Sequence, residues 1–317
     1  MKKNAVASQL DLAVNRLRHG DVVAMPTETV YGLAADASNE AAIARVFAIK
    51  GRPADRPLIV HVAEASWVDD WACDVPSYAR TWMQAFWPGP LTLVLPKQPA
   101  VSERITGGQA TVALRVPDHP LALALLKRFG GALVAPSANR YGQISPTTAQ
   151  AVHDALGDEA PLVLDGGACQ VGIESTIVSC LGETPEILRP GAISPQALVA
   201  AAQIAEPPYR VDAEVVVPGQ ALQHYAPRTP CQMVDQDGLA GFVPRDQRVG
   251  CLGFHAPAWA DSELLMVLPT DPELAARRLY AALRQLDQLG LDLILVEQPP
   301  QGAAWAAIRD RLQRATA

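Results

Sequence analysis

The sequence lacks long hydrophobic runs and paired cysteines. No apolar stretch reaches the ~18 residues that a membrane-spanning helix needs, and the start of the chain, Met1 to Ala5, is not the apolar core of a signal peptide. The five cysteines are widely spaced and include no Cys-x-x-Cys pair, which argues against a disulfide framework or a structural zinc site. We therefore expect a cytoplasmic protein in a reducing compartment, without a membrane contact.

Positive charge is also scarce. The chain has 26 lysines and arginines against 33 aspartates and glutamates, and its net charge is −7. This balance disfavours a broad nucleic-acid-binding surface, because phosphate binding needs clustered Lys and Arg side chains. It still allows a local basic pocket.

Several catalytic motifs are missing as well. There is no Gly-x-x-x-x-Gly-Lys-Ser/Thr phosphate loop, no Gly-x-Gly-x-x-Gly, no His-Glu-x-x-His and no Gly-x-Ser-x-Gly. The six histidines are scattered without the spacing of metal ligands, so we expect no direct protein ligand to a metal. These absences weaken assignments as a P-loop kinase, a dinucleotide dehydrogenase, a zinc hydrolase or an α/β-hydrolase.

The sequence does contain short apolar runs that alternate with helical patterns, in a chain long enough for two domains. The pattern predicts an α/β fold with a main domain of residues 1–203, an ordered proline-rich linker of 204–230 and a small α/β domain of 231–317. We expect strands at 22–25, 58–62, 91–95, 111–117, 132–136, 161–164, 248–254, 264–268 and 291–296. We expect the principal helices to begin at Ser8, Asn39, Pro76, Pro120, Asp271 and Trp305.

The stretch from Pro26 to Leu33 is the first candidate site. It follows a strand-like run and places the hydroxyl of Thr29 and the carboxylate of Glu28 where that strand should end. Ligands bind at strand ends in α/β sheets. An ordinary strand-to-helix loop is the alternative interpretation.

A basic segment provides the second candidate. Lys50, Arg52 and Arg56 lie within seven residues, in a stretch that Gly51 and two prolines keep from being a regular helix. A rigid loop with these cations suits a phosphate clamp, because arginine offers a planar fork and lysine a point charge. Solvated charges at a helix end are the alternative.

Polar or cationic side chains also stand beside the other short strands. Such a set suits a small anionic ligand with phosphate and carboxylate groups, bound largely by charge-assisted hydrogen bonds, and it contains no obvious activated nucleophile. These residues are His61, Arg115, Ser137, Asn139, Ser145, Ser175 and Arg189.

Six of these stretches, taken in order, resemble the YrdC-type threonylcarbamoyl-AMP synthase family. The resemblance covers residues 8–203, and the linker with His224-Tyr225-Ala226-Pro227 resembles the long, two-domain branch of the family. It implies a YrdC-like twisted mixed sheet flanked by helices, followed by a small Rossmann-like C-terminal domain. The matching stretches are Pro26 to Leu33, Lys50 to Arg52, Leu58 to His61, Ser137 to Asn139, Glu174 to Thr176 and Arg189 to Gly191.

The resemblance implies a nucleotidyltransferase, L-threonylcarbamoyladenylate synthase. Such an enzyme converts L-threonine, bicarbonate and ATP, with Mg2+, into threonylcarbamoyl-AMP and pyrophosphate. This is the first step toward N6-threonylcarbamoyladenosine (t6A) in tRNA. The product would pass to the tRNA threonylcarbamoyl transferase complex, and direct contact with tRNA is not required.

The resemblance also assigns residue roles. Lys50 and Arg52 would be catalytic, and substituting either is expected to lower activity with nearly unchanged folding. Thr29, His61, Arg115, Ser175 and the main chain at Ala135 would hold threonine. The nucleotide would be surrounded by Lys50, Arg52, Arg56, Thr111, Ser137, Asn139, Ser145 and Arg189. Because a carbamate is short-lived in water, we also expect the linker to exclude solvent, with His224 or Tyr225 folding over the nucleotide.

Three points stay open. Family members often carry Asn or Lys where this chain has Arg56, so its contact with the nucleotide could differ in geometry. His61 and Glu28 are both candidates for the base that deprotonates threonine. Two other functions also fit in part: an RNA-maturation factor that binds double-stranded RNA or tRNA without adenylation, and a carbamoyl-transfer module, although such modules are fused to partner domains that this chain lacks.

Overall fold

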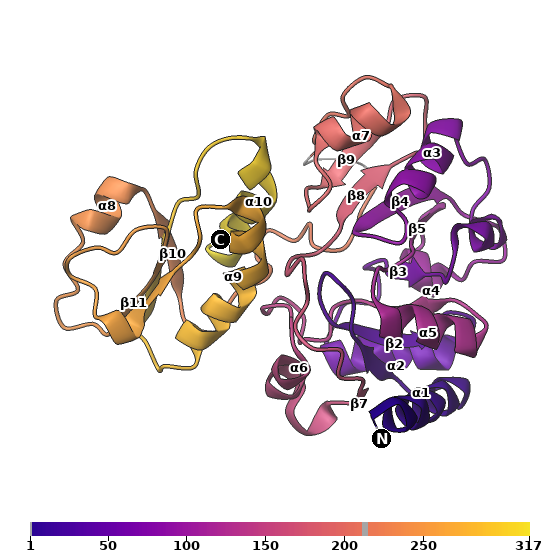
Figure 1. The fold of residues 1–317 in the computed structure, drawn as a ribbon, viewed down its shortest axis with the longest axis horizontal. Helices are drawn as coiled ribbons and strands as arrows, with labels where there is room; N and C mark the ends of the chain where they lie inside the picture. Colours follow the sequence, from indigo (N-terminus) through magenta and orange to yellow (C-terminus); the bar gives the residue numbers. More distant parts are fainter. Residues whose placement is uncertain (1, 211–214) are drawn as a thin grey trace.

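The computed structural model describes residues 2–210 and 215–317, and it contains two sheets in two adjoining bodies (Figure 1). The larger body is built on a nine-stranded mixed sheet and the smaller on a four-stranded parallel sheet. The predicted α/β fold, a large twisted mixed sheet followed by a small Rossmann-like unit, is confirmed. In the part of the chain described, no helix combines the length and the apolar character needed to cross a membrane.

The large sheet has the strand order β7-β1-β2-β6-β3-β5-β4-β8-β9. Parallel pairs join β1 to β7, β3 to β5 and β4 to β8, and the other neighbours are antiparallel. Its strands are β1 (Val23–Met25), β2 (Gly32–Asp36), β3 (Ile59–His61), β4 (Leu91–Pro96), β5 (Thr111–Arg115), β6 (Leu133–Val134), β7 (Leu162–Val163), β8 (Thr176–Ser179) and β9 (Glu186–Arg189).

Helices cover both faces of this sheet. The α-helices of the larger body are α1 (Lys2–Arg18), α2 (Glu40–Lys50), α3 (Ser77–Phe86), α4 (Glu103–Thr106), α5 (Pro120–Phe129), α6 (Ala149–Leu156) and α7 (Pro195–Ala202). Two short 3-10 helices of this body are η1 (Ala65–Asp70) and η2 (Gly157–Glu159).

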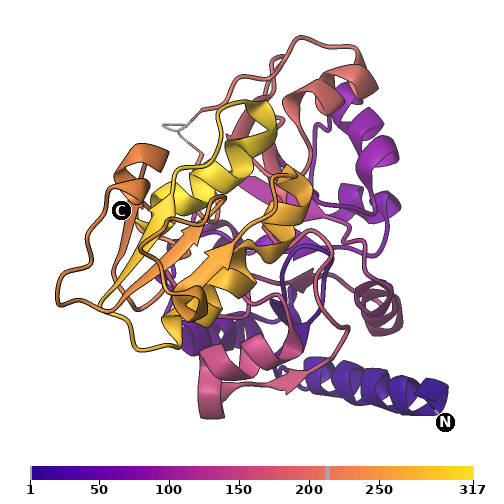
Figure 2. The same ribbon diagram turned by 60° about the vertical axis from the view of Figure 1, so that its left-hand side comes forward.

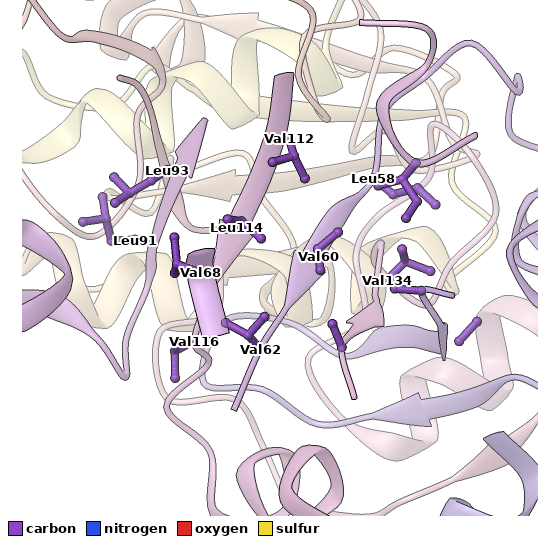
Figure 3. Close-up of a cluster of buried hydrophobic side chains, with 14 of the residues drawn as sticks. Leu58, Val60, Val62, Val68, Leu91, Leu93, Val112, Leu114, Val116 and Val134 are labelled. Carbon is purple, nitrogen blue, oxygen red and sulfur yellow. The ribbon is translucent and has the colours of Figure 1, made fainter. Parts of the chain in front are cut away.

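The core alternates along the strands, as expected for a sheet that is buried on both faces. In β1, Val23 and Met25 pack with α1 and α5, whereas Ala24 packs on the opposite face with α2. Figure 3 shows the second of these clusters, in which Val60 of β3 and Leu114 of β5 lie among other aliphatic side chains. Each such side chain stabilises the fold by about 1.5–3 kcal/mol through burial.

The stretch from Pro26 to Leu33 does not lead into a helix. It reverses the chain between the antiparallel strands β1 and β2, so the strand-to-helix interpretation was wrong. The hydroxyl of Thr27 explains the turn, because it donates to the Val30 carbonyl (2.6 Å) and accepts from the backbone N–H groups of Thr29 and Val30 (3.2 Å each).

Two further local expectations need correction. The first helix begins at Lys2 rather than at Ser8, since no helix-breaking residue precedes Ser8. The strand β10 (Cys231–Val234) was missed, because it is only four residues long and none of its side chains is fully buried.

The small sheet has the order β10-β13-β11-β12, with every neighbouring pair parallel. The side chain of Asp271 caps α9 as predicted, by accepting from the N–H of Leu274 (2.9 Å). The remaining elements of this body are β11 (Val249–Gly253), β12 (Leu265–Val267), β13 (Leu293–Glu297), α8 (Gln236–Ala240), α9 (Pro272–Asp287), α10 (Ala306–Ala315), η3 (Ser262–Leu264) and η4 (Ala303–Trp305).

The two bodies are packed together through a shared apolar cluster. Val30, Ile144 and Ile173 of the larger body join the linker residue Tyr225 and side chains of α9 and α10 in that cluster. In Figure 1, α9 and α10 lie on the side of the small body that faces the large one, and Figure 2 shows the same ribbon with the small body turned forward. Residues 211–214 of the predicted linker lie outside the described residues.

Candidate functional site

A pocket lies where the Pro26–Leu33 loop, the strands β3 and β5, and the linker meet. Strand register explains part of it, because parallel pairing of β3 with β5 sets His61 directly beside Arg115. The pocket is lined by ten of the residues that the sequence suggested: Thr29, Arg52, His61, Arg115, Ala135, Ser137, Ser175, Arg189, His224 and Tyr225.

One end of the pocket is suited to a carboxylate. Arg115 is 4% exposed, and its guanidinium lies 2.7 Å from a carboxylate oxygen of Glu28 and donates through Nε to the Gly89 carbonyl (3.3 Å). Glu28 lies outside the pocket lining. The structure therefore places Glu28 behind Arg115 as its counter-ion, in contact with the arginine rather than with the pocket.

His61 is held in the neutral form at this end. Burial lowers the pKa of His61 to about 3, and the positive charge of Arg115 contributes to the shift. Its Nδ1 has no hydrogen-bond partner within the described residues. A neutral imidazole with a free ring nitrogen can accept a hydrogen bond from a ligand or donate one, depending on its tautomer.

Short hydroxyl groups complete this end. The hydroxyl of Thr29 lies 2.8 Å from that of Thr27, and the hydroxyl of Ser175 lies 2.7 Å from that of Thr92. The N–H of Ala135 is already used, because it donates to the Ile59 carbonyl (3.2 Å). Any main-chain contact of Ala135 with a ligand would therefore use its carbonyl oxygen.

The other end of the pocket is cationic. Arg52 donates to the Pro57 carbonyl (2.9 Å), while its Nε has no partner among the described residues. Burial lowers the pKa of Arg52 to about 10, which still leaves it charged at neutral pH. Arg189 donates from Nε and Nη2 to the Ser175 carbonyl (3.2 and 3.0 Å), so it joins the cationic end to the end that contains Ser175.

Lys50 does not face the pocket directly. Its ammonium donates to the carbonyls of Ser137 (2.5 Å) and Asn139 (2.7 Å), and the residue is 2% exposed. Burial, together with the nearby charge of Arg52, lowers its pKa well below the usual value. In this structure Lys50 fixes the loop that presents Ser137.

Four other predicted residues also lie outside the pocket lining. Thr111 faces a neighbouring hollow, and Arg56 is half-buried. Asn139 donates its amide to the carbonyls of Arg140 and Gln143 (2.8 Å each). The hydroxyl of Ser145 donates to Glu174 (2.6 Å), so it supports the wall from behind.

The linker forms the remaining wall. Arg189 donates to the carbonyl of Pro218 (2.9 Å), and the rings of His224 and Tyr225 meet edge to face with centroids 4.2 Å apart. Burial lowers the pKa of His224 to about 3; the charge of Glu174 opposes this shift, and the cations Lys50, Arg52 and Arg189 add to it. The linker thus contributes a neutral imidazole and a phenol to a site made mostly of cations.

Sequence reasoning missed two residues that support the site from the small body. Arg311 of α10 donates to Glu174 (2.8 Å), and Tyr280 of α9 donates to the same oxygen (2.8 Å). Burial raises the pKa of Glu174, but the charges of Arg311 and Arg189 and hydrogen bonds from Ser145 and Arg311 lower it to about 2 overall. No local motif distinguishes Arg311 from its neighbouring arginines, so the sequence offered no signal for it.

Two family models match the chain. The Sua5/YciO/YrdC model, described as "Telomere recombination", matches residues 15–191, and "Threonylcarbamoyl-AMP synthase, C-terminal domain" matches residues 188–317. The threonylcarbamoyl-AMP synthase of Bacillus subtilis is 40% identical over 97% of this chain and 92% of its own length.

Similar structures and shorter relatives point to the same family. A crystal structure of Pyrococcus abyssi Sua5 complexed with L-threonine is 36% identical, with a TM-score of 0.90, and the match covers 97% of this chain and 94% of that chain. A putative threonylcarbamoyl-AMP synthase of Mycobacterium tuberculosis is 39% identical, but the match covers only 57% of this chain and 83% of its own. The chain therefore belongs to the Sua5/YrdC family of threonylcarbamoyl-AMP synthases, in its long form with a C-terminal domain.

Proposed function

We propose that this protein is an L-threonylcarbamoyladenylate synthase, which forms threonylcarbamoyl-AMP and pyrophosphate from L-threonine, bicarbonate and ATP. One observation carries the proposal: a single pocket joins a carboxylate-binding end at Arg115 to a cationic end at Arg52 and Arg189. An amino acid and a nucleotide can lie in it with their reacting groups adjacent. The relatives named threonylcarbamoyl-AMP synthase support the same assignment.

By this proposal the neutral amine of threonine attacks CO2 and loses a proton to solvent, or attacks bicarbonate with loss of water, and forms a carbamate. A carbamate oxygen then attacks the α-phosphorus of ATP, the bond from that phosphorus to the bridging oxygen breaks, and pyrophosphate leaves. Positioning and neutralisation of charge are the main requirements of such a step, because no covalent intermediate with the protein is needed.

Each end of the pocket has a role in this reaction. Arg115 would bind the carboxylate of threonine, with Thr29, Ser175, His61 and the Ala135 carbonyl around the rest of the amino acid. The developing negative charge of the phosphates would be neutralised by Arg52 and Arg189, beside Ser137. Lys50, Asn139 and Ser145 support the pocket from behind, whereas Arg56 and Thr111 lie outside its lining.

The geometry favours His61 over Glu28 as the group nearest the amine. His61 lines the pocket, whereas Glu28 is paired with Arg115 outside the lining. A neutral imidazole can orient the amine by accepting one of its protons in a hydrogen bond. Its low pKa makes it a weak base, so bulk deprotonation of threonine before binding is the route we favour.

A carbamate is short-lived in water, so the site should exclude solvent during the reaction. We propose that the linker, residues 204–230, serves as the lid between a catalytic domain of 1–203 and a C-terminal domain of 231–317. His224 and Tyr225 are 6% and 1% exposed and stand over the cationic end, which supports this role.

Mg2+ would enter as the complex of ATP, held by the phosphates. Among the described residues there is no group of three or more His, Cys, Asp or Glu side chains that could hold a metal ion. Glu174, the carboxylate that lines the pocket, is already bonded to Arg311, Tyr280 and Ser145. The product would then pass to a tRNA threonylcarbamoyl transferase complex, without a required contact between this protein and tRNA.

The direct test is pyrophosphate release in a reaction with ATP, Mg2+, bicarbonate and L-threonine, with each component omitted in turn. Labelled bicarbonate should appear in a nucleotide product in a one-to-one ratio with pyrophosphate. Omission of threonine should abolish both signals, and D-threonine serves as the control for a specific amino-acid site. Pyrophosphate release that continues without threonine would refute the proposed function.

A further inference from the structure

Arg311 is an arginine of the C-terminal domain whose side chain is completely buried, at 0% exposure. It lies on α10, whose neighbouring residue Arg309 instead contacts the carbonyl of Pro300 within its own domain (2.8 Å). Arginine is rarely buried completely unless its charge and its donors are paired. The groups that pair with Arg311 therefore show what this residue is there to hold.

Three of these groups lie in or next to the pocket lining, and a fourth, the carboxylate of Asp310 on α10 itself, accepts from Nη1 (2.5 Å). Nε of Arg311 donates to the Glu174 carboxylate (2.8 Å), and Nη2 donates to the carbonyl of Pro190 (3.0 Å). The guanidinium also lies over the ring of Tyr225, 5.2 Å from its centroid. Glu174 and Tyr225 line the pocket themselves, and Pro190 follows the lining residue Arg189, so Arg311 touches two pocket residues and the immediate neighbour of a third.

A second residue of the same domain supports this arrangement. The hydroxyl of Tyr280 donates to the Glu174 oxygen that Arg311 binds (2.8 Å), and its ring stacks on Tyr225 with centroids 5.9 Å apart. The other oxygen of Glu174 accepts from Ser145 (2.6 Å). The carboxylate is therefore fixed from both sides, and most of its fixed contacts come from outside the catalytic domain.

We propose that Arg311, assisted by Tyr280, is a positioning residue for the reaction: it holds Glu174, Pro190 and Tyr225 in the register that aligns Ser175, Arg189 and the lid. This inference rests on the proposed function, and it gives the C-terminal domain a defined part in catalysis. Loss of the contact would leave the carboxylate of Glu174 buried in the pocket wall without its charged partner. The wall would then relax, and the two ligands would lose their alignment.

The relatives limit what this arrangement means. Shorter relatives named as threonylcarbamoyl-AMP synthases match only 57% and 51% of this chain. An Arg311 contact is therefore not a general need of the chemistry. In this chain it serves a pocket wall that carries the carboxylate of Glu174.

The test uses full-length variants. Arg311→Lys keeps the positive charge but replaces the planar guanidinium, whose several N–H groups reach separate acceptors, by a single ammonium. Tyr280→Phe removes one hydroxyl and nearly keeps the packed volume. Arg309→Met is the matched control on the same helix. For each variant, kcat and the KM values for threonine and ATP are measured well below the melting temperature of that variant. The affinity for a non-hydrolysable ATP analogue is measured as well.

We expect Arg311→Lys to lower kcat/KM about 10- to 100-fold and Tyr280→Phe to lower it about 3- to 10-fold, because small misalignments of reacting groups cost this much. Arg309→Met should match the wild type. Glu174→Gln should lower kcat/KM less when it is added to Arg311→Met than when it is made in the wild type, since the two residues act as one unit. If the Arg311 variants do not fold, Tyr280→Phe decides the matter.

Two outcomes would overturn the inference. A lower melting temperature with wild-type kcat/KM and wild-type nucleotide affinity would show that Arg311 and Tyr280 only stabilise the domain contact. Additive effects of Glu174→Gln and Arg311→Met would show that the two residues act separately. If the wild-type protein releases no pyrophosphate, the proposed function fails, whereas the inference is still decided by the nucleotide affinity of the same variants.

Discussion

Replacing Lys50 by methionine should destabilise the protein, whereas replacing Arg52 by methionine should mainly lower its activity. The sequence suggested equal roles for these two residues. In the structure, however, the Lys50 ammonium is bound to the carbonyls of Ser137 and Asn139, while Arg52 lines the pocket with a free Nε. The two substitutions therefore separate support of the site from contact with the ligand.

The size of the effect follows from the contacts that are lost. Lys50→Met leaves two largely buried carbonyls without a partner, and each costs about 1–3 kcal/mol. Part of this is recovered, because burial already opposes the charge of Lys50, as its lowered pKa shows. We expect a net loss of about 2–4 kcal/mol in the free energy of unfolding, which corresponds to a fall of about 4–16 °C in melting temperature.

Arg52→Met removes one hydrogen bond, to the Pro57 carbonyl, so it should cost only about 1 kcal/mol of stability. Its charge lies where phosphates would bind, and the loss of one such group should lower kcat about 100- to 1000-fold.

Thermal unfolding followed by circular dichroism, and pyrophosphate release well below the melting temperature, measure the two effects on the same samples. Lys127→Met, at an exposed lysine near the end of α5, is the matched control and should change neither quantity. If Lys50→Met melts like the wild type and yet loses activity as fully as Arg52→Met, Lys50 acts on the substrate directly and the reasoning is wrong.

Three further predictions follow from the site. Glu28→Gln should raise the KM for threonine about tenfold at an unchanged KM for ATP, because it weakens the charged pair that orients Arg115; an unchanged threonine KM would argue against that pairing. Burial lowers the pKa values of His61 and His224 to about 3, so the unfolded state binds more protons than the native state between pH 6.5 and about 3. Each histidine should therefore remove up to about 1.4 kcal/mol of stability per pH unit as the pH falls below 6.5. A melting temperature that is constant from pH 7 to 5 would contradict this. Gly219→Ala should displace the linker and raise the KM for ATP, because Gly219 has φ +87° and an added Cβ would lie 2.1 Å from the hydroxyl of Tyr225. Wild-type kinetics would show that the linker does not close the site.

The sequence predicted most of the large sheet, because its strands are short, apolar and bounded by Gly or Pro. The register of β3 and β5 then brought His61 beside Arg115, although these residues are far apart in the chain. The sequence pattern could not show in which direction a side chain points. A cation at the end of a helix, such as Lys50, can face a pocket or fix a loop behind it, and only the positions of the Ser137 and Asn139 carbonyls distinguish the two.

The support from the C-terminal domain was beyond sequence reasoning for a related physical reason. Arg311 lies on a helix with other arginines, and helical periodicity marks it as an inward-facing position without saying what it meets. Its partner, Glu174, reads locally as an ordinary polar residue before a strand. The pair becomes meaningful only when packing of the two domains buries both charges together, because a charge buried alone would be too costly. A carboxylate that lines a cationic pocket and is neutralised from a neighbouring domain thus makes the catalytic wall depend on how that domain docks.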